Sequence, residues 1–156
     1  MTVTLAEYSA QQVAKNNIAN AVLGYTYSLC EALREDYIKY NIKCHQKAID
    51  RIVNGADYDG RFGTKAYHIA CIDDLQAGNC DYEFYPETGK KYHKIIMNAR
   101  GSRSVHCFVD KQTGQVYKPA SFKAPAKIVR YDLRLIADRE FLFEKADWAG
   151  GYLYLR

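Results

Sequence analysis

The stretch KYHKIIMNARGSRSVHCFVDKQTGQVYK, residues 91–118, contains three runs of strand-forming residues separated by short turn-like segments. The runs cover 91–98, 104–109 and 115–118 and are rich in Ile, Val, Tyr and Phe, which are enriched in β-strands. DKQTGQ places Gly114 where a short hairpin needs positive φ, and PETGK, just upstream, does the same with Gly89. The pattern predicts an antiparallel β-meander.

Two neighbouring runs extend this prediction. KAYHIACI (65–72) and DYEFY (81–85) are β-prone and bounded by turn residues, so the sheet is expected to have about four or five strands. At the other end, Pro119 and Pro125 remove backbone donors, which predicts an ordered loop over KPASFKAPAK, residues 118–127.

The C-terminal region is predicted to contain one helix and one short strand. LRLIADREFLFEKA (133–146) has helical character, with Asp132 as a plausible N-cap, and we expect it to pack on the sheet. GGYLYLR (150–156) is expected to close the chain as an edge strand.

Residues 4–53 are predicted to be helical. Thr4 and Glu7 form a capping-box pattern, and apolar residues then recur at intervals of three and four. Gly24 and YNIKC (40–44) weaken a continuous helix, so the pattern favours two helices over one long helix. NGADYDGRFG (54–63), with three glycines, is predicted to be the turn that ends this part.

These elements define an α+β fold: an N-terminal helical pair or long helix, an antiparallel meander and a C-terminal helix packed on the sheet. With 156 residues, the chain is expected to be a single domain, 1–156, with a helical part (1–54) and a basic β-rich part (55–156). No apolar run is long enough for a membrane span and no leader is recognised, so no membrane partner is expected. Five cysteines without a CxxC pair favour a reducing, cytoplasmic location.

Charge is distributed unevenly along the chain. The net charge is +4, but the segment from Lys90 to Arg130 carries ten lysines and arginines and one acid, Asp110. Such a segment suggests an anionic partner such as a nucleotide-type ligand or nucleic acid, although solubilising lysines on an outer sheet face are the more frequent explanation.

Aromatic residues are interleaved with these cations, as binding of bases and phosphates requires. The stretch SFKAPAKIVRYD (121–132) is interpreted as a proline-stiffened loop that presents three of the cations, with a solvated crossover into the last helix as the alternative. The predicted stacking residues are Tyr92, Tyr117 and Phe122. The predicted phosphate contacts are Arg100, Arg103, Lys118, Lys123, Lys127 and Arg130.

No complete catalytic, metal or cofactor motif is present in the sequence, so no catalytic residue, metal ligand or cofactor is assigned. His68, His93 and His106 fall on three predicted strands and would have to converge on one sheet face to act as acid and base. A small His-dependent phosphodiesterase or nuclease is therefore kept as an alternative.

Residues 104–127, SVHCFVDKQTGQVYKPASFKAPAK, and 146–156, ADWAGGYLYLR, resemble small uncharacterised proteins of tailed bacteriophages, including those of cyanobacteria. The resemblance covers mainly 104–156 and implies that this tail is one structural unit in a protein of the bacterial cytoplasm. It also implies a viral accessory protein that acts by binding, for example by sequestering a nucleotide signal of host defence.

The leading functional hypothesis is a non-enzymatic protein that binds a phosphate-bearing ligand, either a nucleotide-type small molecule or nucleic acid. The alternative from another class is an inhibitor that binds a host enzyme through its helical face. The N-terminal helices are also a possible surface for homo-oligomerisation.

Overall fold

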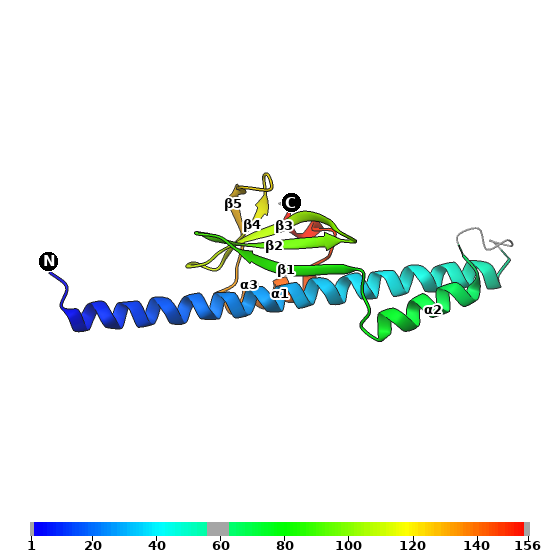
Figure 1. Ribbon diagram of the computed structural model, residues 1–156, viewed down its shortest axis with the longest axis horizontal. Helices are drawn as coiled ribbons and strands as arrows, with labels where there is room; N and C mark the ends of the chain where they lie inside the picture. Colours follow the sequence, from blue (N-terminus) through cyan, green and yellow to red (C-terminus); the bar gives the residue numbers. More distant parts are fainter. Residues whose placement is uncertain (1, 56–62, 155–156) are drawn as a thin grey trace.

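The computed structural model describes residues 2–55 and 63–154, and it has the predicted α+β architecture (Figure 1). The helices are α1 (Leu5–Val53), α2 (Lys65–Gln76), α3 (Ile136–Lys145) and the short 3-10 helix η1 (Gly151–Leu153). The strands are β1 (Tyr82–Thr88), β2 (Tyr92–Ala99), β3 (Ser102–Asp110), β4 (Gln115–Pro119) and β5 (Pro125–Asp132).

The N-terminal helix is continuous, so the preference for two helices was wrong. α1 contains 49 residues and begins with the predicted capping box between Thr4 and Glu7. Gly24 is exposed, with no other group near the place of a Cβ, so its cost is mainly the helix propensity of about 1 kcal/mol. Buried residues lie on both sides of it, Val22 and Leu29 among them, and their packing outweighs that cost.

The sheet is an antiparallel meander in the order β1-β2-β3-β4-β5, as predicted. Gly114 has φ of 75°, in agreement with its predicted role in the β3–β4 turn. The same prediction for Gly89 was wrong, because Gly89 is not among the residues with positive φ; its N–H donates to the Tyr92 carbonyl at 2.9 Å. The β2–β3 turn instead uses Arg100 (φ 55°) and Gly101 (φ 91°).

Residues 65–72 were predicted to form a strand, but they belong to helix α2. Thr64 caps this helix by accepting a hydrogen bond from the Tyr67 N–H at 3.1 Å. His68 and Leu75 are buried as α2 packs along the far part of α1. A short apolar run does not distinguish a strand from a buried helix, and here contact with α1 decided the outcome.

The region 118–132 also differs from its prediction, because only residues 120–124 form a loop. Pro119 and Pro125 lie opposite each other at the ends of β4 and β5, where β5 is an edge strand and the missing donors are tolerated. The stretch 125–132 is therefore a strand, not a loop.

The C-terminal elements differ in detail. α3 begins at Ile136 after Leu135, because the Asp132 carboxylate accepts from the Arg134 N–H at 2.9 Å and caps no helix. Of GGYLYLR, residues 151–153 form η1 and no edge strand, and residues 155–156 lie outside the described residues. Most of the predicted turn at 54–63, residues 56–62, also lies outside them.

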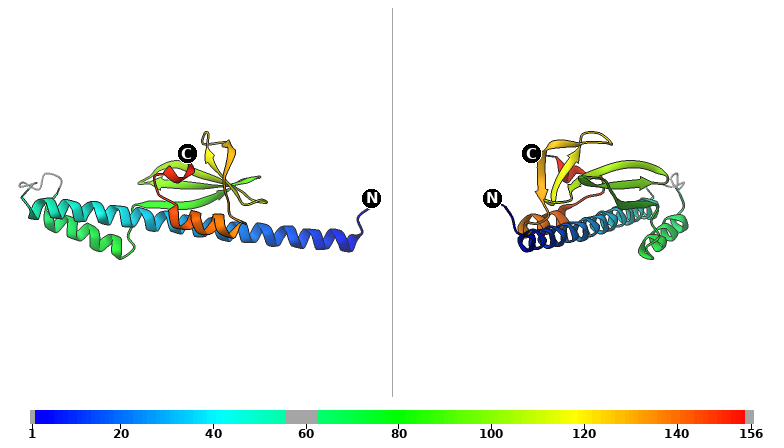
Figure 2. Two further views of the ribbon diagram at one scale, coloured as in Figure 1. Left: turned by 180° about the vertical axis from the view of Figure 1, so that it is seen from behind. Right: turned by 60° about the vertical axis from the view of Figure 1, so that its left-hand side comes forward.

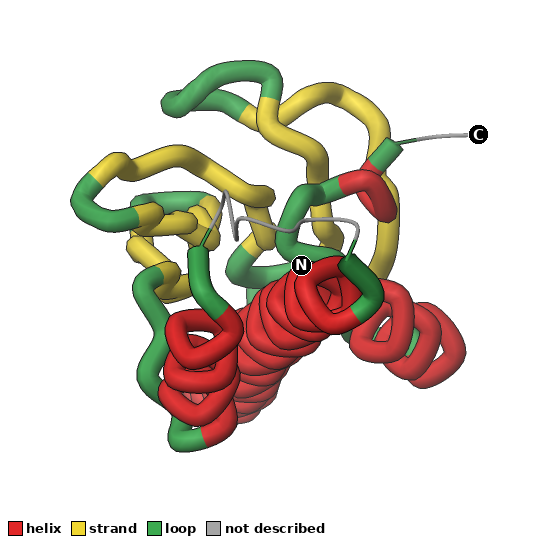
Figure 3. The backbone as a smooth tube through the Cα atoms, turned by 90° about the vertical axis from the view of Figure 1, so that its right-hand side faces the viewer, coloured by secondary structure: helices red, strands yellow, loops and turns green. Residues whose placement is uncertain are grey.

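The core lies between the sheet and α1, while α2 and α3 flank α1 on opposite sides (Figures 2 and 3). From α1 it takes Val22, Leu29, Cys30, Leu33 and Tyr37, and from the sheet Phe84, Ile95, Cys107, Val109 and Val116. Because both parts contribute to this cluster, the helical and β-rich parts share one core.

Candidate functional site: a groove beside β3

The sheet bends sharply between β3 and β4. In the described residues these strands pair only through Phe108–Tyr117 and Val109–Val116. β4 and β5 then turn away from β1, β2 and β3 (Figure 1). The first half of β3 is therefore left without a partner on this side, and two adjoining cavities open beside it.

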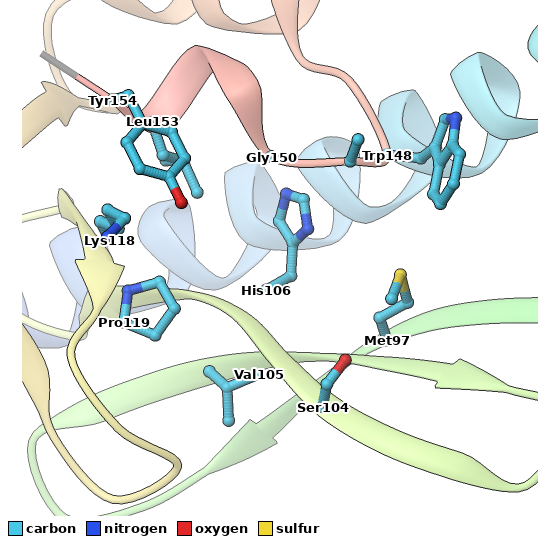
Figure 4. Close-up of a pocket in the computed structure, with 11 residues that line it drawn as sticks. Met97, Ser104, Val105, His106, Lys118, Pro119, Trp148, Gly150, Leu153 and Tyr154 are labelled. Carbon is cyan, nitrogen blue, oxygen red and sulfur yellow. The ribbon is translucent and has the colours of Figure 1, made fainter.

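The first cavity lies between β3, the end of β4 and the C-terminal segment (Figure 4). Its volume is about 330 Å³, within the range of about 300–1,000 Å³ found for small-molecule sites. It combines a cation, an aromatic ring and a hydroxyl, from Lys118, Tyr154 and Ser104. Trp148 lies at its edge, with its ring packed against Tyr37, Tyr40 and Tyr82. The Lys118 Nζ lies 4.4 Å from the centre of the Tyr154 ring.

The second cavity, of about 350 Å³, shares Ser104, Val105 and Pro119 with the first. It adds Arg103 and Phe122, the latter from the β4–β5 hairpin. We call the two cavities together the β3 groove. Each of its two halves offers one cation and at least one aromatic ring.

The C-terminal wall of the groove is fixed by hydrogen bonds. The Arg130 Nε–H donates to the Leu153 carbonyl at 2.6 Å, and the Tyr131 hydroxyl donates to the Tyr152 carbonyl at 2.6 Å. The Asp147 carboxylate accepts from the N–H groups of Gly151 and Tyr152, both at 3.2 Å. These contacts hold residues 150–153 against β5, so the wall is preorganised.

His106 lies at the floor of the first cavity and is buried. It is the extra residue of a β-bulge, because Ile95 pairs with Cys107 and Ile96 with Val105. Its Nε2 lies 2.7 Å from the Tyr152 hydroxyl. Burial lowers the pKa of His106 to about 4, so the ring is neutral at neutral pH and adds no charge to the groove.

Three of the nine predicted ligand-binding residues line the groove: Arg103, Lys118 and Phe122. Two more, Tyr92 and Tyr117, lie together with ring centres 6.1 Å apart. They flank Phe108, which lies between Cys107 and Val109 in β3 and so points away from α1. Lys94 connects this cluster to the groove, since its Nζ lies 5.8 Å from the Phe108 ring and 4.9 Å from the Phe122 ring.

The other four predicted cations lie elsewhere. Arg100 is at the opposite end of β2, in an ion pair with Asp81, and Arg130 supports the C-terminal wall. Lys123 and Lys127 are exposed on the β4–β5 hairpin and line neither cavity. Arg103, although it lines the groove, also forms an ion pair with Glu87 on β1. The six predicted cations thus do not form one cluster.

Sequence reasoning missed Trp148, Tyr154 and His106 as parts of the groove. The available signal was the sequence ADWAGGYLYLR, which carries Trp148 and Tyr154 on either side of Gly150. Gly150 has φ of 85°, and a Cβ there would lie 3.6 Å from the His106 ring. This turn brings the segment back over β3.

The three histidines do not share one sheet face. His68 lies on α2, with its Nδ1 2.9 Å from Nδ1 of His45 on α1, whereas His93 and His106 lie on β2 and β3. The His93 Nδ1 is 2.8 Å from the Thr88 hydroxyl, whereas the His106 Nε2 contacts the Tyr152 hydroxyl. Among residues 2–55 and 63–154, no group of three or more His, Cys, Asp or Glu side chains is arranged to hold a metal ion.

The fold and groove define an α+β protein with a five-strand meander on a long helix and an open, basic and aromatic groove at a bend of the sheet. The chain belongs to DUF7717, a family of unknown function, which it matches over residues 5–155. No curated protein and no solved structure matches the chain. In the described part of the chain, no helix is both long and apolar enough to cross a membrane.

Proposed function

We propose that this protein binds a phosphate-bearing ligand that also carries a base, and that the β3 groove is the binding site. The observation that carries the proposal is that each half of the groove combines a cation with an aromatic ring. The Lys118 Nζ lies 4.4 Å from the centre of the Tyr154 ring in the first half, and Arg103 and Phe122 both line the second. Aromatic faces stack on bases and cations pair with phosphates.

The groove favours single-stranded nucleic acid over one free nucleotide. It is open, and its two halves adjoin along the unpaired edge of β3, so consecutive nucleotides could occupy them. A longer nucleic-acid strand would also pass Lys123 and Lys127, which are exposed on the β4–β5 hairpin. Both are among the phosphate contacts predicted from the sequence. A free nucleotide sequestered from a host defence pathway would fill one half only.

We place this activity in a reducing, cytoplasmic compartment, because all five cysteines are free thiols and two of them, Cys30 and Cys107, are buried. Burial raises the pKa of Cys30 to about 12, which makes this thiol unreactive. A viral accessory role in a bacterial host remains a prediction from the resemblance of residues 104–156.

The test uses Trp148, the single tryptophan of the chain, as a reporter at the edge of the groove. Its emission is titrated with a single-stranded oligonucleotide of about eight nucleotides and with ATP, since site sizes of about 4–16 nucleotides are usual. Lys118→Glu and Arg103→Glu are each expected to weaken binding at least tenfold, because each removes a charge-assisted contact worth about 1.5–3 kcal/mol. Lys47→Glu, on the distant part of α1, makes the same change in charge and is the matched control.

Salt dependence separates the two ligand classes. An oligonucleotide that contacts Arg103, Lys118, Lys123 and Lys127 is expected to lose about 2.8 log units of affinity per tenfold rise in salt, and ATP much less. Lys123→Glu and Lys127→Glu should weaken binding of the oligonucleotide and leave binding of ATP unchanged. If neither ligand binds, or if Lys47→Glu weakens binding as much as Lys118→Glu does, the groove is not the binding site.

A further inference from the structure

The start of α1 is unusual because it packs against no other part of the described chain. We call residues 5–17 the arm; Figure 1 shows it projecting beyond the sheet and beyond α3. Its side chains are exposed except for Gln12, which is half-buried, and three are large and apolar. Leu5 is 81% exposed, Tyr8 55% and Val13 59%.

A helical segment of this kind is only marginally stable by itself. Isolated helices shorter than about 12–15 residues rarely persist in water, and most helical stability in proteins comes from packing of an apolar face. The capping box at Thr4 and Glu7 fixes where the helix begins, and the packed region from Ile18 fixes where it enters the core. Nothing in the described chain covers the residues between.

One face of the arm continues the face of α1 that packs on the sheet. From Val22, positions spaced by three or four residues lead outward through Ala19, Lys15, Gln12, Tyr8 and Leu5. Val22 is fully buried and Ala19 half-buried, whereas Tyr8 and Leu5 at the outer end are exposed. The arm therefore presents a stripe with Leu5 and Tyr8 at its outer end and polar residues in its middle, and no described residue covers the outer end.

This stripe is complementary to itself when two copies run antiparallel. If Tyr8 lies opposite Ala19 of a second copy, the large ring meets a small side chain, and Gln12 falls opposite Lys15, where its carbonyl oxygen can accept from the ammonium group. A two-fold axis repeats each contact. The arm has one acid, Glu7, and one base, Lys15, so two arms do not repel each other by net charge.

The same register brings Leu5 of one copy to the level of Val22 of the other, next to the start of α3. There Leu135 and Ile136 are exposed, the latter by 64%. α3 lies beside α1 at this level, because the Arg139 guanidinium is 4.1 Å from the Tyr25 ring. Residues 5–22 of each helix would overlap over about 27 Å. A specific interface buries at least about 1,000 Å², so the start of α3 is needed in addition to the arm.

We propose that the protein is a homodimer in which two arms pair antiparallel and each covers the exposed start of α3 on the other copy. This goes beyond ligand binding in the groove and does not depend on it.

The test measures the mass of the full-length protein in solution by light scattering after size exclusion, over a range of concentrations. The native chain is expected to be a dimer, and Leu5→Glu and Tyr8→Glu are each expected to raise the dimer dissociation constant at least a hundredfold. Val13→Glu is the matched control, since Val13 is as exposed as Tyr8 but lies off the stripe. A monomer at all concentrations, or a dimer that survives Leu5→Glu and Tyr8→Glu, would overturn the proposal.

Cross-linking tests the direction of pairing. The double variant Tyr8→Cys with Ala19→Cys should give a covalent dimer on oxidation, whereas Tyr8→Cys alone should give no more than the native chain, whose exposed Cys44 sets the background. Residues 8 and 19 are about 16 Å apart along one helix, so they cannot bridge within a chain. Efficient cross-linking by Tyr8→Cys alone would indicate parallel arms and contradict the proposed register.

Discussion

Two parts of α1, the arm (residues 5–17) and the packed part (residues 22–37), behave differently although they belong to one helix. Between Val22 and Tyr37 the helix is held by the sheet, and its core-facing side chains are fully or almost fully buried. Along the arm the same periodicity continues, but no group of the described chain packs on it. The packed part therefore owes its structure to tertiary contacts, and the arm depends on its N-cap and, in our proposal, on a second copy.

The largest expected effect comes from the packed part. Leu29→Ala removes a fully buried side chain from the core between α1 and the sheet. Such truncations usually cost 2–5 kcal/mol, from lost burial and the cavity that remains. Chemical denaturation followed by Trp148 emission should show a loss of about 3 kcal/mol. Leu5→Ala, the same substitution in the arm, is the control, and an equal loss in a monomeric background would refute the contrast between the two parts.

A somewhat smaller effect on stability is expected from a change of pH, through His106 on β3. Because the folded pKa is about 4 and the ordinary value is 6.5, the unfolded chain binds more protons between these values, and stability falls as the pH falls through this range. The contribution of His106 to the unfolding free energy is complete above pH 6.5, and at pH 5 it is lower by about 2 kcal/mol.

His106→Gln keeps a polar side chain and removes this titration. The unfolding free energy of the variant should therefore decrease less than that of the native chain between pH 7 and pH 5. His93→Gln is a second test of the same kind, because burial also lowers the pKa of His93, and this variant should lose part of the pH dependence as well. If the pH dependence of the native chain and of His106→Gln were the same, His106 would not be held neutral in the folded protein.

Local sequence signals predicted the elements whose form is set by neighbours in the chain. The capping box of Thr4 and Glu7, the meander and the turn at Gly114 all depend on such signals. Residues 65–72 and the continuity of α1 could not be predicted in this way. Their structure depends on contacts between α2 and α1, and between α1 and the sheet, which join distant parts of the chain.

The groove was predictable only in part for a related reason. Strand alternation correctly grouped Tyr92 with Lys94, and charge counting drew attention to Lys118 and Arg103. The bulge at His106 and the return of Trp148 and Tyr154 over β3 break the simple alternation, and no composition rule anticipates them. Bends and bulges that create a cavity are the features that strand periodicity does not report.

The smallest expected effect comes from a substitution that acts on the arm and leaves the core between α1 and the sheet unchanged. Thr4→Ala removes the hydroxyl that accepts from the Glu7 N–H at 3.2 Å, and it leaves the Glu7 carboxylate without its place in the capping box. The loss is about 1 kcal/mol of helix stability at most, and it acts on the first turns. Far-UV circular dichroism should show reduced helicity. In a monomeric Tyr8→Glu background, the unfolding free energy detected by Trp148 emission should stay within about 0.3 kcal/mol of the value without Thr4→Ala, because the two sites are distant and share no partner. Thr4→Ser is the conservative control and should restore helicity. A large shift of the unfolding midpoint would mean that the arm and the core unfold as one unit.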